Sequence, residues 1–361
     1  MTVLYFFLIV YFVTIAFLIY GFSKIKNFDV VDAIPTTKFS IIIPFRNENE
    51  NLPQLLNSIS MLDYPTTLLE VILVDDGSDL KFKIPHYDFK ISMLENSRVS
   101  TSPKKDAILT AIQMISNEWI VTTDADCVVH PKWLLTLDSF IQNKNPEMIV
   151  GAVTYSKINS FLYYFQQLDL ASLQGTTIGS FGLKRGFMCN GANFAYTKKF
   201  FTELDGFDGN DKIASGDDVF LLQKAITRSP EKVLYLKSAN NIITTNPEKS
   251  WSDLFSQRVR WASKTKNYES IFGKFLGLIV FTGNLSWLMI FAWVLADWRW
   301  FSIFVCAFKF GIDAVLLIQT QKFLKFDLKY VLLSSFLYPF FSVSVAIYSF
   351  FGKYEWKERS F

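Results

Sequence analysis

Two aspartates separated by one residue follow an apolar run, and this spacing suits divalent-metal chemistry. Asp124 and Asp126 come directly after residues 119–123. Carboxylates at positions i and i+2 can both reach one hard cation if the chain turns there, and Mg²⁺ or Mn²⁺ bound in this way completes its shell with substrate phosphates. Such an ion offsets the charge on a departing diphosphate. The alternative is an acidic turn that caps a helix starting at 131–133.

A second acidic pair, Asp75 and Asp76, follows the apolar run 71–74 and precedes Gly77-Ser78. Short acidic side chains at the end of a strand can accept hydrogen bonds from a nucleobase edge or a ribose hydroxyl. The alternative is a turn in which Asp, Gly and Ser serve only the backbone.

A third acidic pair, Asp217 and Asp218, opens the apolar helical stretch 219–226. A carboxylate at such a position can act as a general base that takes the proton of a hydroxyl group, and such a base contributes roughly 10²–10⁴-fold. The alternative is structural, because a helix dipole favours acidic residues in the first turn.

Basic and aromatic residues gather in 257–261. On a helix, Gln257 and Trp261 share a face and Arg260 is adjacent. A guanidinium can grip diphosphate oxygens in a bidentate way, and a tryptophan can line a sugar channel. The alternative is a basic helix lying against anionic lipid headgroups, the only role that we expect for Arg258, Lys264 and Lys266. Earlier in the chain, Lys104 and Lys105 precede a helical run, where one ammonium can reach a phosphate.

Residues 37–270 read as one soluble domain that positions these side chains. Apolar runs typical of strands, at 39–44, 71–74 and 119–123, alternate with helical stretches such as 104–117. This alternation predicts an α/β fold with a mainly parallel sheet covered by helices. Ligands of such sheets bind beyond the carboxyl ends of the strands, where the acidic pairs and the polar cluster 46–48 are expected.

Apolar segments flank this domain. Residues 3–22 carry no charge and are long enough to cross a bilayer within an N-terminal anchor, 1–23. A cleaved signal peptide is the alternative, but no basic segment precedes the run and no small-x-small site follows it. Lys24 and Lys26 directly after it place the following domain in the cytosol.

The C-terminal membrane region, 271–361, contains two to three helices, with candidate spans near 275–296, 299–320 and 329–351. The middle span carries Lys309 and Asp313, which share a helix face. They form either an internal ion pair or a lipid-substrate site. One anchor plus three spans would put the C-terminus outside, although the tail has basic residues that favour the inside, namely Lys353, Lys357 and Arg359.

Composition excludes several classes. The 361 residues carry a net charge of +3, which gives no electrostatic case for nucleic-acid binding. The three scattered cysteines indicate neither a disulfide framework nor a zinc site, and two histidines exclude a histidine-rich metal centre. Half of the residues are hydrophobic, which is too apolar for a purely soluble protein.

The order of these pieces resembles glycosyltransferase family 2 over residues 38–265. The implied fold is GT-A, a Rossmann-like α/β fold, here with transmembrane helices at both ends. The last piece looks like the family's membrane-embedded branch, which includes cellulose, hyaluronan and poly-N-acetylglucosamine synthases. The resemblance rests on these segments in sequence: Ile43-Pro44-Phe45-Arg46-Asn47-Glu48, Val74-Asp75-Asp76-Gly77-Ser78, Lys104, Thr123-Asp124-Ala125-Asp126-Cys127, Asn190-Gly191-Ala192-Asn193, Gly216-Asp217-Asp218 and Gln257-Arg258-Val259-Arg260-Trp261.

The resemblance implies a nucleotide diphosphate sugar as donor, UDP-linked, and a divalent metal ion, Mg²⁺ or Mn²⁺, as cofactor. Asp75 and Asp76 would contact the nucleoside, and Lys104 would approach the donor phosphates. Asp124 and Asp126 would bind the metal, with Asp126 the more direct ligand and Asp124 also against the donor.

The resemblance also implies a catalytic base, Asp218, with Asp217 as its partner. Gln257, Arg260 and Trp261 would hold the donor and line the acceptor. The implied protein is an inverting, metal-dependent glycosyltransferase at the cytosolic face of a membrane. Its acceptor would be a hydroxyl or phosphate of a lipid-linked molecule or a glycan, and the short membrane region favours transfer of one or a few sugars over processive export.

Two other classes stay open. A catalytically inactive membrane scaffold, or a subunit of a polysaccharide export complex, would not need the acidic sites, yet all three acidic pairs are present. A nucleotidyltransferase also uses paired aspartates and magnesium, but it would release pyrophosphate. A nicotinamide-linked oxidoreductase is not indicated, because no strand is followed by Gly-x-Gly-x-x-Gly.

Overall fold

The computed structural model describes residues 1–31, 34–210, 213, 215–297, 299–351, 355–356 and 359–360, the last four by their backbone alone. The chain forms two compact units, each built from segments that are far apart in sequence. The sheet unit comprises Lys26–Ser156 and Met188–Asn246, and the helical unit comprises Met1–Ile25, Lys157–Phe187 and Pro247–Phe361. Segments 157–187 and 247–270, which the sequence joined to the soluble domain, therefore group with the apolar helices.

The sheet unit contains, within the described ranges, a seven-stranded mixed sheet in the order β3-β2-β1-β4-β7-β5-β8. Its first four strands are parallel, and β7 runs antiparallel to both of its neighbours. The mainly parallel sheet predicted from the sequence is thus confirmed. The strands are β1 (Phe39–Phe45), β2 (Leu69–Asp75), β3 (Lys90–Glu95), β4 (Trp119–Thr122), β5 (Met148–Val150), β7 (Phe194–Thr197) and β8 (Val233–Tyr235).

The central strands form the core of this unit. All seven residues of β2 are buried, as are all four of β4. Because neighbouring residues of a strand point to opposite faces, both faces of the sheet are covered. The α-helices of the unit are α2 (Leu52–Ser60), α3 (Pro103–Met114), α4 (Trp133–Lys144), α6 (Lys198–Glu203) and α7 (Asp217–Arg228).

Smaller elements complete the sheet unit. Strands β6 (Val153–Tyr155) and β9 (Ile243–Thr245) pair in parallel as a separate two-stranded sheet. The described part of this unit also contains four short 3-10 helices: η1 (Thr66–Leu68), η2 (Gly191–Asn193), η3 (Pro230–Lys232) and η4 (Ala239–Asn241).

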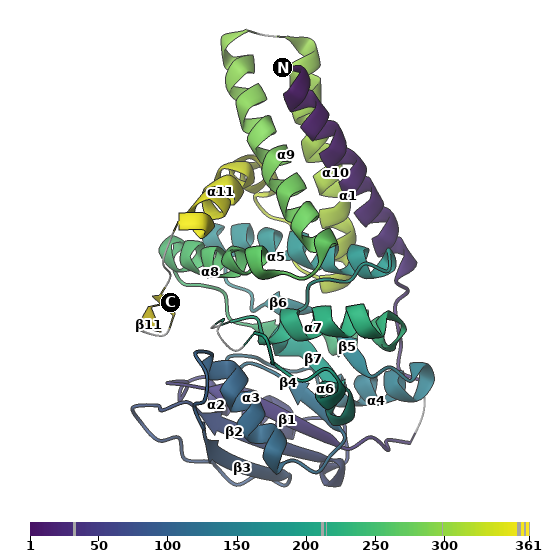
Figure 1. Cartoon of the computed structure of the whole chain (residues 1–361), viewed down its shortest axis with the longest axis vertical. Helices are drawn as coiled ribbons and strands as arrows, with labels where there is room; N and C mark the ends of the chain where they lie inside the picture. Colours follow the sequence, from purple (N-terminus) through teal and green to yellow (C-terminus); the bar gives the residue numbers. More distant parts are fainter. Residues whose placement is uncertain are drawn as a thin grey trace. The chain divides into compact units, whose positions relative to one another are not determined.

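The helical unit contains the long apolar helices. Among the described residues, four helices are long and apolar enough to cross a membrane: α1 (Thr2–Lys24), α9 (Ile271–Ala296), α10 (Trp300–Leu324) and α11 (Val331–Phe351). They coincide with the four segments predicted from the sequence. Helices α1, α9 and α10 run alongside one another, whereas α5 (Phe161–Gly182) and α8 (Trp251–Ser263) lie crosswise to them (Figure 1).

Helix α1 approaches α5 closely through glycine. A Cβ atom added to Gly182 would lie only 1.8 Å from the carbonyl oxygen of Gly21, and one added to Gly21 would lie 2.1 Å from the carbonyl oxygen of Gly179. Only glycine permits this contact between two helix backbones. The unit also contains η5 (Lys264–Asn267) and the short strands β10 (Glu355–Trp356) and β11 (Arg359–Ser360).

The charges within the middle C-terminal helix form an internal ion pair, the first of the two alternatives. Nζ of Lys309 lies 2.9 Å from Oδ2 of Asp313, and the Lys309 side chain is 1% exposed. The hydroxyl of Tyr11 on α1 donates to Oδ1 of the same carboxylate at 2.7 Å. The pair therefore joins α10 to α1. Of the basic tail residues, Lys353 and Lys357 lie outside the described residues.

Candidate active site

The Asp124–Asp126 segment forms a turn directly beyond β4. The amide of Cys127 donates to the carbonyl of Asp124 at 3.1 Å, and the chain then pairs with β9 through Val128 and Thr244. The predicted alternative, that these aspartates cap the following helix, is wrong: α4 begins at Trp133 and its N-cap is Lys132. Both carboxylates are left at the carboxyl end of a central parallel strand.

Lys104 gathers acidic groups from two elements. It lies in the first turn of α3, and its Nζ is 2.7 Å from Oδ1 of Asp124 and 3.5 Å from Oδ2 of Asp217. Burial by itself lowers the pKa of Lys104, but Asp124, Asp217 and Asp218 outweigh it and hold this pKa above its ordinary value. The ammonium is therefore charged at physiological pH.

Gly191 closes the arrangement around this lysine. Its amide donates to Oδ2 of Asp218 at 2.8 Å, and its carbonyl accepts from the hydroxyl of Thr122 on β4 at 2.7 Å. A Cβ atom at this position would lie 3.1 Å from Nζ of Lys104 and 3.2 Å from Oδ2 of Asp217. The lack of a side chain lets these groups meet. Asp217 is buried and Asp218 is partly exposed, so Asp218 is the more accessible carboxylate.

Asp126 has the chemistry of a cation ligand. Its Oδ2 accepts from the hydroxyl of Thr245 on β9 at 2.9 Å. Burial, together with the nearby carboxylates of Asp124 and Glu48, raises the pKa of Asp126 to about 6. Crowded carboxylate oxygens are the ligands that Mg²⁺ and Mn²⁺ prefer. Within the described residues no group of three or more His, Cys, Asp or Glu side chains could hold a metal ion.

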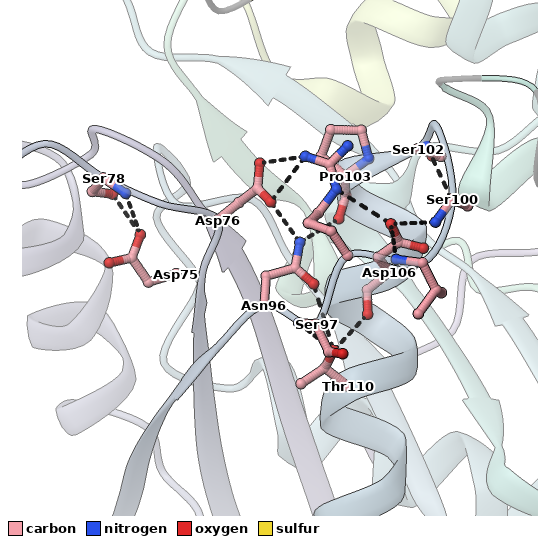
Figure 2. Close-up of polar contacts among 12 residues, drawn as sticks. Asp75, Asp76, Ser78, Asn96, Ser97, Ser100, Ser102, Pro103, Asp106 and Thr110 are labelled. Atoms are coloured by element: carbon pink, nitrogen blue, oxygen red, sulfur yellow. Dashed lines mark hydrogen bonds and ion pairs between the residues drawn. The ribbon is translucent and has the colours of Figure 1, made fainter.

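The two residues of the second acidic pair, Asp75 and Asp76, have different hydrogen-bond partners. Oδ1 of Asp75 accepts from both the amide and the hydroxyl of Ser78, at 2.8 and 2.6 Å, which is the turn foreseen as the alternative. Asp76 instead points toward the loop after β3, where its Oδ1 accepts from Nδ2 of Asn96 at 2.6 Å (Figure 2).

The sequence missed this group of partners for Asp76. Arg98 contacts both Asp76 and Asp106, which lies on α3. Strand β3 is a half-exposed edge strand without an apolar run, and it was not predicted. The polar segment Asn96-Ser97-Arg98 directly after residues 90–95 is the pattern that could have indicated these partners.

The remaining predicted residues lie on α8, in the helical unit. Gln257 lies between two partners: its Nε2 donates to Glu248 and its Oε1 accepts from Arg258. Arg258 also pairs with Asp169 on α5. The guanidinium stacks over Trp261, with its carbon 4.3 Å from the ring centroid.

The prediction that Arg258 serves only lipid headgroups is wrong. Its side chain is 5% exposed, and its charge is matched inside the unit. Arg260 is partly exposed and lies close enough to Glu248 to act on the pKa of that carboxyl. Burial raises the pKa of Glu248, with Asp253 adding to the rise, while Arg258 and Arg260 oppose it.

Comparison with a solved structure shows the class of fold. Over 97% of the chain and 98% of the other protein, the structure is similar to the mannosyltransferase PcManGT of Pyrobaculum calidifontis, solved with GDP-Man and Mn²⁺, at a TM-score of 0.61 and 14% identity. This likeness shows the GT-A fold, which the sequence had predicted.

Sequence comparison then identifies a domain. Residues 40–205 match the family model for glycosyl transferase family 2. The chain is 25% identical over 318 residues to poly-β-1,6-N-acetyl-D-glucosamine synthase of Staphylococcus epidermidis, which covers 84% of this chain and 72% of that protein. It is also 28% identical over 127 residues to the glycosyltransferase AglE of Haloferax volcanii, 33% of this chain and 40% of that protein. The chain therefore carries a glycosyltransferase family 2 domain and is a glycosyltransferase.

Proposed function

We propose that this protein is an inverting, metal-dependent glycosyltransferase that moves a sugar from a nucleotide diphosphate donor to an acceptor at a membrane. The observation that carries the proposal is the contact of Lys104 with both Asp124 and Asp217. Asp218 follows Asp217 directly in the chain, and Asp126 lies two positions after Asp124. This arrangement combines a cation for phosphate, two carboxylates for a metal ion and a carboxylate for an acceptor proton.

The metal would be held by Asp126 and Asp124, with Mg²⁺ or Mn²⁺ as the candidates. When bound, the ion would offset the negative charge that builds on the departing diphosphate. PcManGT binds Mn²⁺ with its donor, which supports the same cofactor class here. Lys104 would move from Asp124 to the donor phosphates once the ion occupies that carboxylate.

Asp218 would act as the general base. One of its oxygens accepts from the Gly191 amide, and the other accepts from the amide of Val219 at 2.7 Å. These bonds fix the direction of the carboxylate. It would take the proton of the acceptor hydroxyl while that oxygen attacks the anomeric carbon opposite the leaving nucleotide, so that the configuration inverts. Asp217 lies beside it and pairs with Lys104.

The nucleoside would lie against Asp76, with Asp75 shaping the turn beneath it. The proposed donor is UDP-linked, and the sugar is left open. Gln257, Arg260 and Trp261 on α8 are proposed to hold the donor and line the acceptor. The acceptor would be a lipid-linked molecule or a glycan, since the chain has four helices, in its described part, that are apolar enough to span a membrane. Lys24 and Lys26 after the first of them favour a cytosolic catalytic domain.

The test is a screen of nucleotide sugars with membranes that contain the protein. UDP-sugars and GDP-mannose would be supplied one at a time, with release of nucleoside diphosphate as the first readout and the mass of the labelled product as the second. Turnover of one donor with formation of a glycosylated product is expected. Release of pyrophosphate would indicate a nucleotidyltransferase, and no turnover of any donor would contradict the proposal.

A further inference from the structure

The Asp76 carboxylate is held by two side chains from one loop. Asp76 is 9% exposed, and its Oδ1 accepts from Nδ2 of Asn96 at 2.6 Å. NH1 of Arg98 lies 3.3 Å from Oδ1 and 3.4 Å from Oδ2, so one guanidinium nitrogen faces both oxygens. A carboxylate gripped from two sides in this way has little freedom to rotate.

The same guanidinium reaches a second carboxylate through a different nitrogen. Nε of Arg98 lies 3.3 Å from Oδ2 of Asp106, whose side chain is fully buried. That oxygen also accepts from the backbone amides of Val99 and Ser100, at 3.1 and 3.0 Å. The loop is thereby folded onto the first turn of α3. A lysine could not reproduce this bridge, because its single ammonium cannot present two nitrogens in a fixed fork.

The bridge connects two parts of the proposed donor site. Asp106 lies two residues after Lys104 on α3, so Arg98 ties the carboxylate proposed for the nucleoside to the helix that carries the lysine proposed for the phosphates. Asn96 adds a parallel connection, because its Nδ2 also donates to the carbonyl of Pro103 at 3.0 Å. These contacts differ from an ordinary surface ion pair, in which both partners are exposed. The Arg98 side chain is 37% exposed, but the carboxylates of Asp76 and Asp106 are at most 9% exposed.

We propose that Arg98 is a positioning residue for donor binding: it fixes the direction of the Asp76 carboxylate and its distance from Lys104. The inference rests on the proposed function, since it assumes that Asp76 contacts the nucleoside. Arg98 acts through Asp76 and takes no part in the sugar-transfer step itself. Its loss affects the capture of donor and leaves the chemical step unchanged.

The test uses Arg98→Gln and Arg98→Lys in the full-length protein. KM for the active nucleotide sugar and kcat are measured, together with the Kd of the free nucleoside diphosphate. Arg98→Gln is expected to raise KM and Kd about tenfold or more, in line with the loss of hydrogen bonds to charged groups, while kcat stays within about threefold. Arg98→Lys should recover only part of this loss. Unchanged KM and Kd in Arg98→Lys and Arg98→Gln would overturn the inference.

A double-mutant cycle separates action through Asp76 from direct contact with the donor. If Arg98 works through Asp76, then adding Arg98→Gln to Asp76→Asn should change Kd by less than about twofold. Full additivity of the two effects would overturn the positioning role. Asp106→Asn should reproduce part of the Arg98→Gln effect on Kd, because it releases the other end of the bridge.

Matched variants guard against general loss of structure. Arg228 is an exposed arginine on α7, and Asp138 is a buried carboxylate on α4 that accepts the backbone amide of Thr37 at 2.9 Å. Arg228→Gln and Asp138→Asn should leave Kd for the nucleotide unchanged. If Arg98→Gln does not fold, Arg98→Lys decides the question by the same split between KM and kcat. If wild-type protein binds no nucleotide, the proposed function is contradicted. If wild type turns over its donor and the Arg98 variants have the same KM and Kd as wild type, only this inference is contradicted.

Discussion

Nζ of Lys104 lies 2.7 Å from Oδ1 of Asp124, which joins the start of α3 to the turn beyond β4. The two residues carry opposite charges and are proposed to bind opposite ends of the same diphosphate–metal unit. With these proposed roles, the pair would hold the site in shape before a donor arrives and would open when the donor binds.

Lys104→Met should weaken donor binding. It removes the cation from a group of three carboxylates, and hydrogen bonds to charged groups contribute about 1.5–3 kcal/mol, which corresponds to roughly 10–100-fold in Kd. We expect the Kd of the nucleoside diphosphate to rise by at least tenfold in a calorimetric titration. Lys81→Met, at an exposed ion pair with Glu95, serves as the control. A Kd equal to that of wild type would exclude Lys104 from phosphate binding.

Asp218→Asn should abolish turnover and preserve donor binding. The amide keeps the size of the side chain and one of its two hydrogen-bond-accepting oxygens but cannot take a proton, so kcat should fall by roughly 10²–10⁴-fold. Radiolabelled sugar transfer gives kcat, and nucleotide titration gives Kd. Asp208→Asn, at an exposed position before α7, should retain both. Transfer at more than a tenth of the wild-type rate would remove Asp218 from the role of base.

Removal of divalent metal should stop transfer, and added Mg²⁺ or Mn²⁺ should restore it. Asp126→Ala removes the ligand that we propose as the more direct one, so Mn²⁺ binding measured by electron paramagnetic resonance should weaken together with nucleotide binding. Full transfer in the presence of excess chelator would contradict metal dependence, whatever the effect of the substitution.

Loss of one partner of the Lys309–Asp313 pair should destabilise the protein, whereas apolar replacement of both partners should not. Removing one partner of a buried ion pair costs about 3–5 kcal/mol, whereas apolar replacement of both is close to neutral. Lys309→Met alone should lower the thermal unfolding temperature in detergent, and Lys309→Met combined with Asp313→Leu should restore most of it. Donor turnover should follow the folded fraction in both variants. A double variant as unstable as the single one would argue against this account.

Glu248 should make stability depend on pH. Its pKa is raised above 4.5, chiefly by burial, so the folded protein holds this proton more tightly than the unfolded chain does. The resulting stabilisation is present at low pH and is lost as the pH rises from 4.5 through the raised pKa. Glu248→Gln should therefore lose less stability than wild type between pH 4.5 and neutrality.

Thermal unfolding at a series of pH values measures this difference for Glu248. Glu231→Gln, at an exposed position, should behave as wild type. Parallel unfolding curves for Glu248→Gln and wild type across the range would show that Glu248 has an ordinary pKa.

The sequence predicted the central strands well because they are buried on both faces. A fully buried parallel strand leaves a continuous apolar run, and the ends of β1, β2 and β4 fall within one or two residues of the predicted runs. The acidic pairs at the ends of β2 and β4 were placed correctly for the same reason. The four apolar helices were equally legible, since length and hydropathy alone define them.

The missing parts depend on contacts that no spacing reveals. All residues of edge strand β3 are exposed or partly exposed, and β5, β6, β8 and β9 have only three residues each, too few for a pattern. The contact between Asp126 and Thr245 joins residues 119 positions apart. Arg258 looked like a surface cation because its partner Asp169 lies 89 positions earlier, on a helix that the sequence did not single out.

The interleaving of the two units has a practical consequence. Along the chain, residues 1–25, 157–187 and 247–361 alternate with 26–156 and 188–246, so no single cut separates a soluble catalyst from its anchor. A fragment spanning 26–246 would still contain α5, stripped of the close glycine contact that α1 provides. We expect such a fragment to aggregate, and we expect purification of the whole chain to need detergent or lipid, because four helices among the described residues are long and apolar enough to cross a membrane.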